Sequence, residues 1–145
     1  MVPLTTVSVY DVATDTWYEQ TTSVADDTER PSDRFDACTV GVSSGDGTSH
    51  NIYVYGGTDY PMGDLALSDV YILSIPAFKW IYAGNTSKPR MNHGCTLVSN
   101  KYMLMYGGHS IPTDQTDNIF KEFAASGLLP SPKFCCCFYR RRTNK

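Results

Sequence analysis

Asn51-Ile52-Tyr53-Val54-Tyr55-Gly56-Gly57 is a run of β-branched and aromatic residues that ends in a glycine pair. Two further runs of the same character follow, Asp69–Ile75 and Lys79–Tyr82, and only Pro76, Ala77 and Phe78 lie between them. Such runs are typical of β-strands, and the short link favours antiparallel pairing because parallel strands need long crossovers. This part of the sequence therefore predicts an antiparallel meander.

The same period-two pattern extends to both sides of this stretch. Turn residues separate the runs, for example Ser44-Gly45-Asp46-Gly47 and Ser99-Asn100-Lys101. Thr21–Asp33 and Thr58–Ser68 are longer, less regular and predicted to be exposed loops. The predicted strands are Val7–Val12, Thr16–Gln20, Ala37–Val42, Asn51–Tyr55, Asp69–Ile75, Lys79–Tyr82, Cys95–Ser99 and Tyr102–Tyr106.

Three segments of the chain occur twice. Tyr53–Gly57 returns as Leu104–Gly108, 51 residues later when the first glycines are compared. Val9–Val12 followed by Trp17 returns as Val70–Leu73 followed by Trp80, and Arg34–Val40 returns loosely as Arg90–Val98. A period of about 50 residues with a double glycine is typical of four-stranded propeller blades.

These residues resemble the kelch motif of the galactose oxidase/kelch-type propeller superfamily, and their wording is similar to fungal kelch-repeat proteins. The motif is carried by Gly56-Gly57, Tyr71 and Trp80, with a second pair at Gly107-Gly108 and an earlier Tyr10 and Trp17. The resemblance covers residues 5–108. It implies an all-β fold with about two four-stranded antiparallel blades, which is a piece of a propeller because closure needs about four to eight blades.

Within that resemblance the chain divides into an outer half-blade at 5–20, a complete blade at 34–83 and an inner half-blade at 92–108. Residues 109–145 are expected to be a non-propeller tail, irregular or with a short helix over Asp114–Ser126, or an error of the gene model. The motif residues are expected to be structural. Glycine pairs suit sharp turns and close approach, and Tyr71 and Trp80 are expected to lie between blades.

The resemblance implies a non-catalytic scaffold that binds a protein partner through its loops. The candidate contact loops are Asp26–Arg34, Thr58–Ser68 and Gly84–Asn92. No catalytic, cofactor-binding or metal-binding residue is predicted, since His50, His93 and His109 are scattered singly. The alternatives are a fragment of a galactose-oxidase-like copper enzyme whose active site is absent from this sequence, and a non-functional truncated product.

The cysteines fall into two groups. Cys38 and Cys95 occupy equivalent places in successive repeats, which should lie farther apart than the roughly 7 Å that a disulfide allows between Cα atoms, so both are expected to be small buried apolar residues. Cys135, Cys136 and Cys137 precede Arg140-Arg141-Arg142. Clustered cysteines beside arginines predict lipidation and membrane contact, while accidental coding is the alternative reading.

The charge is uneven. Residues 121–145 carry a net +5, so the other 120 residues carry −8, and an acidic body disfavours nucleic acid as a partner. Asn85-Thr86-Ser87 is an N-glycosylation sequon. Neither a signal peptide nor a membrane-spanning run is predicted from these residues, and the resemblance allows either a membrane-anchored or a cytoplasmic parent protein.

Overall fold

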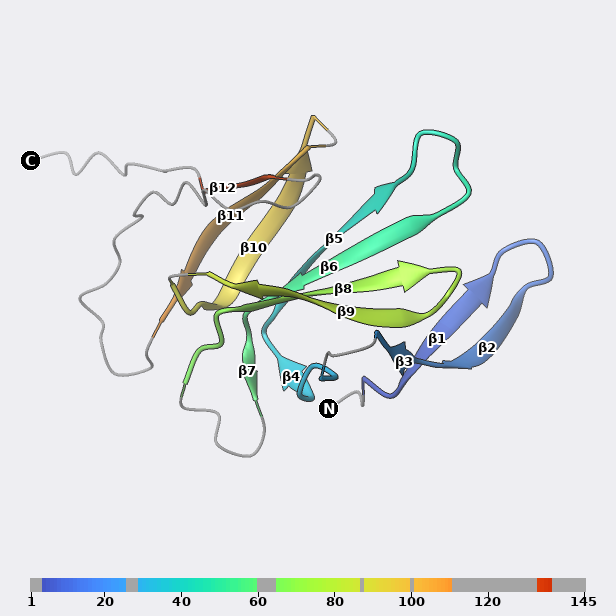
Figure 1. The fold of residues 1–145 in the computed structure, drawn as a ribbon, viewed down its shortest axis with the longest axis horizontal. Coiled ribbons are helices and arrows are strands. Elements are labelled where there is room, and N and C mark those ends of the chain that lie inside the picture. Colours follow the sequence, from blue (N-terminus) through green and yellow to red (C-terminus); the bar gives the residue numbers. More distant parts are fainter. Residues whose placement is uncertain are drawn as a thin grey trace, which may run out of the picture.

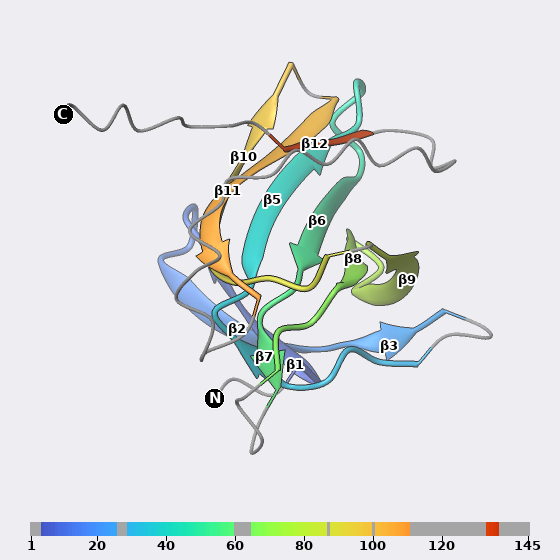
Figure 2. The same ribbon diagram turned by 90° about the vertical axis from the view of Figure 1, so that its left-hand side faces the viewer.

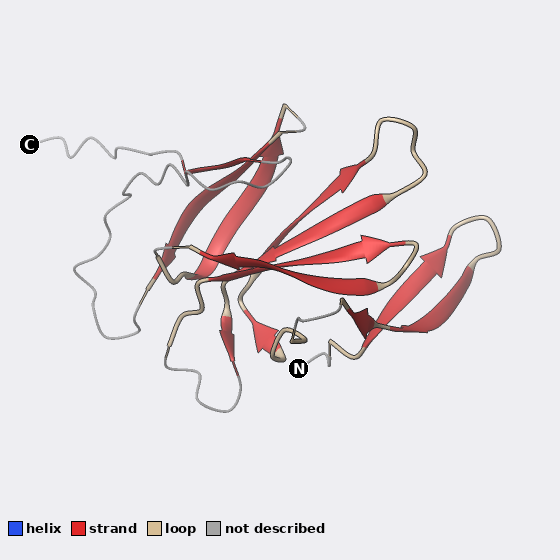
Figure 3. Cartoon of the chain, viewed as in Figure 1, coloured by secondary structure: helices blue, strands red, loops and turns tan. Residues whose placement is uncertain are grey.

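The computed structural model describes residues 4–25, 29–59, 65–86, 88–99, 101–110 and 133–136. Every regular element in this part of the chain is a β-strand (Figure 3), so the predicted all-β fold is confirmed. Consequently none of these residues forms an apolar helix long enough to cross a bilayer. The strands are β1 (Thr6–Asp11), β2 (Thr16–Thr21), β3 (Ser23–Val24), β4 (Arg34–Phe35), β5 (Cys38–Ser43), β6 (His50–Tyr55), β7 (Thr58–Asp59), β8 (Asp69–Ile75), β9 (Lys79–Asn85), β10 (Met91–Val98), β11 (Tyr102–His109) and β12 (Lys133–Cys136).

The central sheet is the antiparallel meander β5-β6-β8-β9 (Figure 1). Its register pairs Tyr53 with Val40 on one side and with Ile72 on the other. The short strand β3 joins the outer edge of β9 in parallel, because the chain leaving β2 runs along that edge. These four main strands form the antiparallel meander that the sequence predicts, and the added β3 was not predicted.

Two hairpins flank the central sheet: β1–β2 on one side and β10–β11 on the other (Figure 2). All eight predicted strands are present, with ends that differ from the prediction by a few residues. The short strands β4 and β7 pair with each other. β7 lies within Thr58–Ser68, which was predicted to be a loop, and β4 follows directly after the predicted loop Thr21–Asp33.

The C-terminal tail differs from its prediction where the structure describes it. Lys133–Cys136 forms β12, which pairs in parallel with β11 from Tyr102 to Met105. An irregular or helical segment was expected here, and the edge of β11 instead offers backbone groups that a strand can bond. The predicted helix over Asp114–Ser126 lies outside the described residues.

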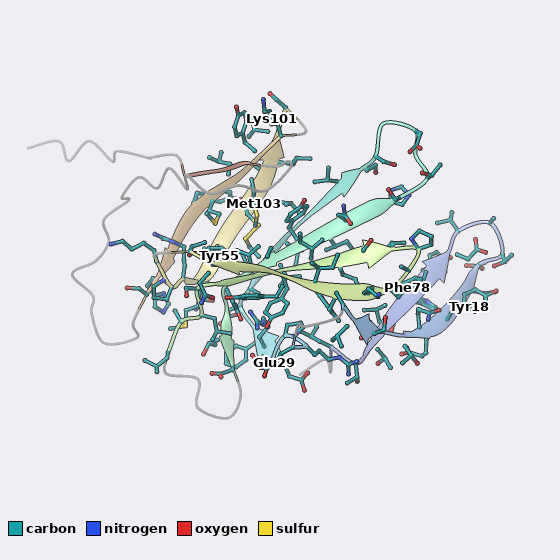
Figure 4. The ribbon with its side chains drawn as sticks, in the orientation of Figure 1. Tyr18, Glu29, Tyr55, Phe78, Lys101 and Met103 are labelled. Carbon is teal, nitrogen blue, oxygen red and sulfur yellow. A yellow bond between two sulfur atoms is a disulfide. The ribbon has the colours of Figure 1, made fainter. Side chains whose placement is uncertain are left out.

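Two apolar clusters hold the sheets together, one on each face of the central sheet. Alternation along a strand sends successive side chains to opposite faces. Tyr53 and Tyr55 therefore pack towards β10–β11 with Met103, whereas Val54 packs on the other face with Trp80 and the partly buried Leu4. Met103 and Tyr55 are labelled in Figure 4. This face-to-face stacking of sheets is how propeller blades bury their apolar residues.

Candidate interaction surface

The candidate contact loops all leave the same end of the sheets. They connect β2 to β5, β6 to β8 and β9 to β10, whereas the tight hairpins of β1–β2, β5–β6 and β8–β9 turn at the opposite end (Figure 1). An antiparallel meander requires this division, because alternate connections lie at alternate ends. We call the end with the three long connections the loop face.

Backbone hydrogen bonds join the second and third of these loops. The amide of Leu67 donates to Gly57 (2.7 Å), the amide of Arg90 donates to Leu67 (2.9 Å), and the amide of Gly57 donates to Arg90 (2.8 Å). A further bond runs from Thr86 N–H to the carbonyl of Ser68 (2.7 Å). These hydrogen bonds therefore fix the second and third loops to each other.

The first loop joins them through β4–β7 and through a pair of equivalent turns. Asp36 and Asn92 both have positive φ, 58° and 54°, a conformation that Asp and Asn tolerate best among residues other than glycine. The amide of Asn92 donates to the carbonyl of Asp36 (3.1 Å), so the turn before β5 is bonded directly to the turn within β10. All three candidate loops thus contribute to one continuous surface.

Arg34, in the first loop, bonds to residues on both sides of the second loop. Its guanidinium binds both carboxylate oxygens of Asp69, at 2.5 and 2.9 Å, and also donates to the carbonyl of Gly56 (3.1 Å). The Arg34 side chain is 3 % exposed and lies 5.6 Å from the ring centroid of Tyr71. A buried bidentate pair of this kind needs both partners, since either charge alone would be costly to bury.

Arg90 repeats half of this arrangement in the next unit. Its guanidinium donates to the carbonyl of Gly107, as that of Arg34 does to Gly56. The sequence comparison aligned Arg34 with Arg90 but assigned neither a role. Each arginine donates a hydrogen bond to the carbonyl of the first glycine in its pair. The sequence similarity around the two arginines could not reveal these contacts, because they join residues far apart in the chain.

The glycine pairs lie where the backbone is closely approached. Gly56 and Gly57 have φ of 63° and 89°, and a Cβ on Gly57 would lie 2.6 Å from the carbonyl oxygen of Phe35. A Cβ on Gly56 would collide with the carbonyl oxygen of Arg90. Gly107 and Gly108 have φ of 70° and 74°. Side chains are excluded at Gly56 and Gly57 by both conformation and space.

Of the motif aromatics, one pair is buried and the other is exposed. Tyr71 and Trp80 are 8 % and 2 % exposed and meet edge to face, with ring centroids 6.5 Å apart. Tyr10 and Trp17 lie opposite each other on β1 and β2 but are 41 % and 68 % exposed. The difference is what covers them: Leu4 and Val7 pack against the cluster of Trp80.

Exposed side chains on the loop face mix apolar and charged groups. Phe35 and Leu65 are 45 % and 66 % exposed, although both are large apolar residues. Glu29, labelled in Figure 4, and Lys88 are also exposed, as is Asn92. Apolar contacts within a charged surround are the usual composition of a protein-binding patch. Leu65 lies within the predicted loop Thr58–Ser68, whereas Phe35 lies one residue beyond the predicted loop Asp26–Arg34, and the sequence singled out neither residue.

His93 lies buried below this surface. Its ring packs edge to face on Tyr55, with centroids 5.0 Å apart, and neither ring nitrogen has a hydrogen-bond partner among the described residues. Burial, with a smaller contribution from the charge of Arg90, lowers the pKa of His93 to about 4. The imidazole is therefore neutral at pH 7 and forms part of the packing. Nowhere in the part of the chain that the structure describes do three His, Cys, Asp or Glu gather as metal ligands would.

The expectation for Cys38 and Cys95 was wrong, because the two residues form a disulfide with Cα atoms 5.8 Å apart. The register explains this. Cys38 pairs with Tyr55, whereas Cys95 pairs with Met105, and the residue opposite Tyr106, the repeat equivalent of Tyr55, is Gly94. Cys95 is thus offset by one position from Cys38, and a one-residue offset turns a side chain to the opposite face of its sheet. The two sulfur atoms therefore face each other across the gap between neighbouring sheets.

The remaining predicted sites are those for glycosylation and lipidation. Asn85 is the exposed last residue of β9. The backbones of Cys135 and Cys136 belong to β12, opposite Leu104 and Met105, while Cys137 lies outside the described residues. Lipidation of these three cysteines, and membrane contact through them, stay predictions.

Comparison with known proteins adds one relative. A protein named "Kelch repeat-containing protein", from Arthroderma benhamiae, is 36 % identical over 109 residues. The match covers 71 % of this chain and 16 % of the relative, so the chain spans less than a fifth of that protein's length. The chain matches no family model.

Proposed function

This chain belongs to the kelch-repeat family, and on that premise we propose that it is part of a non-catalytic scaffold that binds a protein through its loop face. The observation that carries the proposal is the bonding of the three long connections into one surface. Loops held by a rigid β-scaffold are the usual place for recognition. The relative's name supports the kelch family and identifies no partner.

Phe35 is the residue we expect to anchor the partner. It is held on β4 opposite Thr58, a residue that is itself 1 % exposed, so its backbone is fixed while its ring is 45 % exposed. An aromatic side chain presented from a fixed backbone loses little conformational freedom on binding. Leu65, on the loop between β7 and β8, widens the apolar area.

We further propose that the chain is a piece of a larger propeller, with a blade before β1–β2. Tyr10 and Trp17 stand at the positions that Tyr71 and Trp80 occupy in the central sheet. Trp80 is covered by chain from the preceding hairpin, whereas Trp17 is 68 % exposed. A preceding blade would cover Tyr10 and Trp17 as Leu4 and Val7 help to cover Trp80.

The far face of β10–β11 supports a blade on that side as well. Tyr106 is the repeat equivalent of Tyr55, yet Tyr55 is 2 % exposed and Tyr106 is 53 % exposed. Tyr55 is covered by β10–β11, and Tyr106 has the same orientation one blade further on. In this proposal residues 5–20, 34–83 and 92–108 are the outer half, the whole and the inner half of three successive blades.

The test compares the unaltered protein, expressed from its own gene, with two variants. Phe35→Glu places a charge on the loop face, and Val12→Glu places the same charge on an apolar residue that is 82 % exposed in the hairpin at the opposite end. Proteins crosslinked to each form in the cell are quantified by mass spectrometry. The proposal expects a specific set that Val12→Glu retains and Phe35→Glu loses at least tenfold. Retention of the same set by both variants would refute the loop face as the binding site.

A further inference from the structure

We propose that Asn85 carries an N-linked oligosaccharide, and that the chain folds in an oxidising secretory compartment where the Cys38–Cys95 disulfide is closed. Two independent observations meet in this proposal: the exposed position of the sequon asparagine and a disulfide that joins two sheets. The inference does not depend on the proposed protein-binding function.

The end of β9 is built to turn Asn85 outward. The register between β8 and β9 shifts at Val70 and Tyr71, which leaves Ala83 without a partner, and Gly84 has a φ of 112°. Bulges of this kind redirect the side chains that follow them. Asn85 then stands opposite Asp69 at the end of the ladder, and it is exposed.

The next residue points the other way. The hydroxyl of Thr86 lies 3.1 Å from the hydroxyl of Tyr55 and donates to the carbonyl of Lys88 (3.0 Å), and the Thr86 amide donates to Ser68 (2.7 Å). Thr86 is therefore fixed towards the interior, and alternation leaves Asn85 on the outside. Ser87, which completes the sequon in the sequence, lies outside the described residues.

The disulfide indicates the compartment in which the chain folds. Cys38 is 6 % exposed, and its bond to Cys95 closes 57 residues of chain between two neighbouring sheets. Disulfides that staple a fold persist in secreted proteins and in the secretory pathway and are rare in the cytosol. N-glycosylation of Asn-x-Ser/Thr marks surface positions of proteins in that pathway. The same compartment therefore accounts for both features.

The chemistry needs two co-reactants. In glycosylation the amide nitrogen of Asn85 forms a bond to the anomeric carbon of a lipid-pyrophosphate-linked oligosaccharide, the bond from that carbon to the pyrophosphate oxygen breaks, and the amide gives up one proton as the lipid pyrophosphate leaves. In disulfide formation the two thiols transfer two electrons and two protons to an oxidised thiol-disulfide exchange protein, which becomes a dithiol.

The test isolates the complete protein from its own cells and maps both sites by mass spectrometry. Free thiols are blocked with one alkylating reagent, the protein is reduced, and the released thiols are blocked with a second. Trypsin should yield residues 80–90 as one peptide, because Pro89 protects the bond after Lys88. Peptide-N-glycosidase in 18O-water converts a glycosylated asparagine to 18O-labelled aspartate. The expected result is label at Asn85 and the second reagent on Cys38 and Cys95.

A matched pair of variants makes the result specific. Ser87→Ala breaks the sequon and Ser87→Thr keeps it, so the label should vanish in the first and persist in the second. Thr86→Ala removes the inward hydrogen bonds while leaving the sequon intact, and it should keep the label. Recovery of the unmodified 80–90 peptide as the main form of the untreated protein would overturn the proposal. So would Cys38 and Cys95 carrying the first reagent.

Discussion

The indole N–H of Trp80 donates a hydrogen bond of 3.0 Å to the carbonyl oxygen of Leu4, 76 residues earlier in the chain. The hydroxyl of Thr22 donates to the same oxygen (2.8 Å), so one carbonyl before β1 is shared by the central sheet and by the chain that leaves β2. This bond satisfies the polar atom of the largest buried side chain. The chain before β1 therefore supplies the hydrogen-bond acceptor for the Trp80 indole.

Trp80→Ala should destabilise the chain by about 3–5 kcal/mol, because it opens a cavity and leaves an acceptor with one donor fewer. Trp17→Ala is the matched control. It removes the equivalent residue of β2, which is 68 % exposed, and should change stability by about 0.5 kcal/mol or less. Urea unfolding followed by circular dichroism measures both. Equal losses would contradict the burial difference.

The proposed preceding blade can be tested in a longer protein that extends this chain before β1–β2. If a blade covers Trp17, Trp17→Ala should there cost about as much as Trp80→Ala, about 3–5 kcal/mol. An unchanged small cost in the longer protein would refute the proposed preceding blade while leaving the loop face untouched. The same unfolding measurement decides between these outcomes.

Arg34→Gln should cost about 3–5 kcal/mol of stability, because it leaves the Asp69 carboxylate partly buried without its cation. Arg90→Gln removes a contact to a carbonyl alone and should cost about 1 kcal/mol. The double variant Arg34→Gln with Asp69→Asn should be less destabilised than the sum of its single changes. Strict additivity in that cycle, measured by denaturant unfolding, would show that the pair does not act as a unit.

The sequence predicted the strands well and the contacts between sheets poorly. Short runs such as Asp69–Ile75 carry their own pattern and turn signals, so they could be located locally. The offset of Cys95 could not, because it depends on how many residues the hairpins at Ser44–Ser49 and Ser99–Lys101 consume. One residue more or less in a hairpin loop would move the Cys95 side chain to the opposite face of its sheet, where it could not reach Cys38.

The candidate surface was predictable in outline only. Its three loops were chosen as the rim loops that the propeller resemblance implies, and the structure shows hydrogen bonds and strand pairing between them. The roles of Arg34 and Arg90 depend on carbonyls of Gly56 and Gly107, which are brought near by strand pairing rather than by sequence. The repeat aligned Arg34 with Arg90, but it did not show that each guanidinium donates to a glycine carbonyl, because that contact depends on the fold.

Removing the disulfide should lower stability by about 4 kcal/mol, the chain-entropy value for a closed loop of this length. The change is Cys38→Ala together with Cys95→Ala, so that no unpaired thiol is left. Adding a reductant to the unaltered chain should produce a loss of similar size and leave the variant unchanged. A reductant that lowers the unfolding midpoint of both proteins equally would contradict a contribution from this bond.

Stability should rise with pH between about 4 and 6.5 because of His93. Burial, and to a lesser extent Arg90, lowers the pKa of His93 to about 4, so in this window the unfolded chain binds a proton that the folded chain does not. The contribution is complete above the unfolded pKa of about 6.5 and is lost as pH falls towards 4. His93→Gln should remove this slope, whereas His50→Gln should keep it because His93 is still present. Urea midpoints at half-unit pH steps measure the slope, and an identical slope in both variants would place its origin elsewhere.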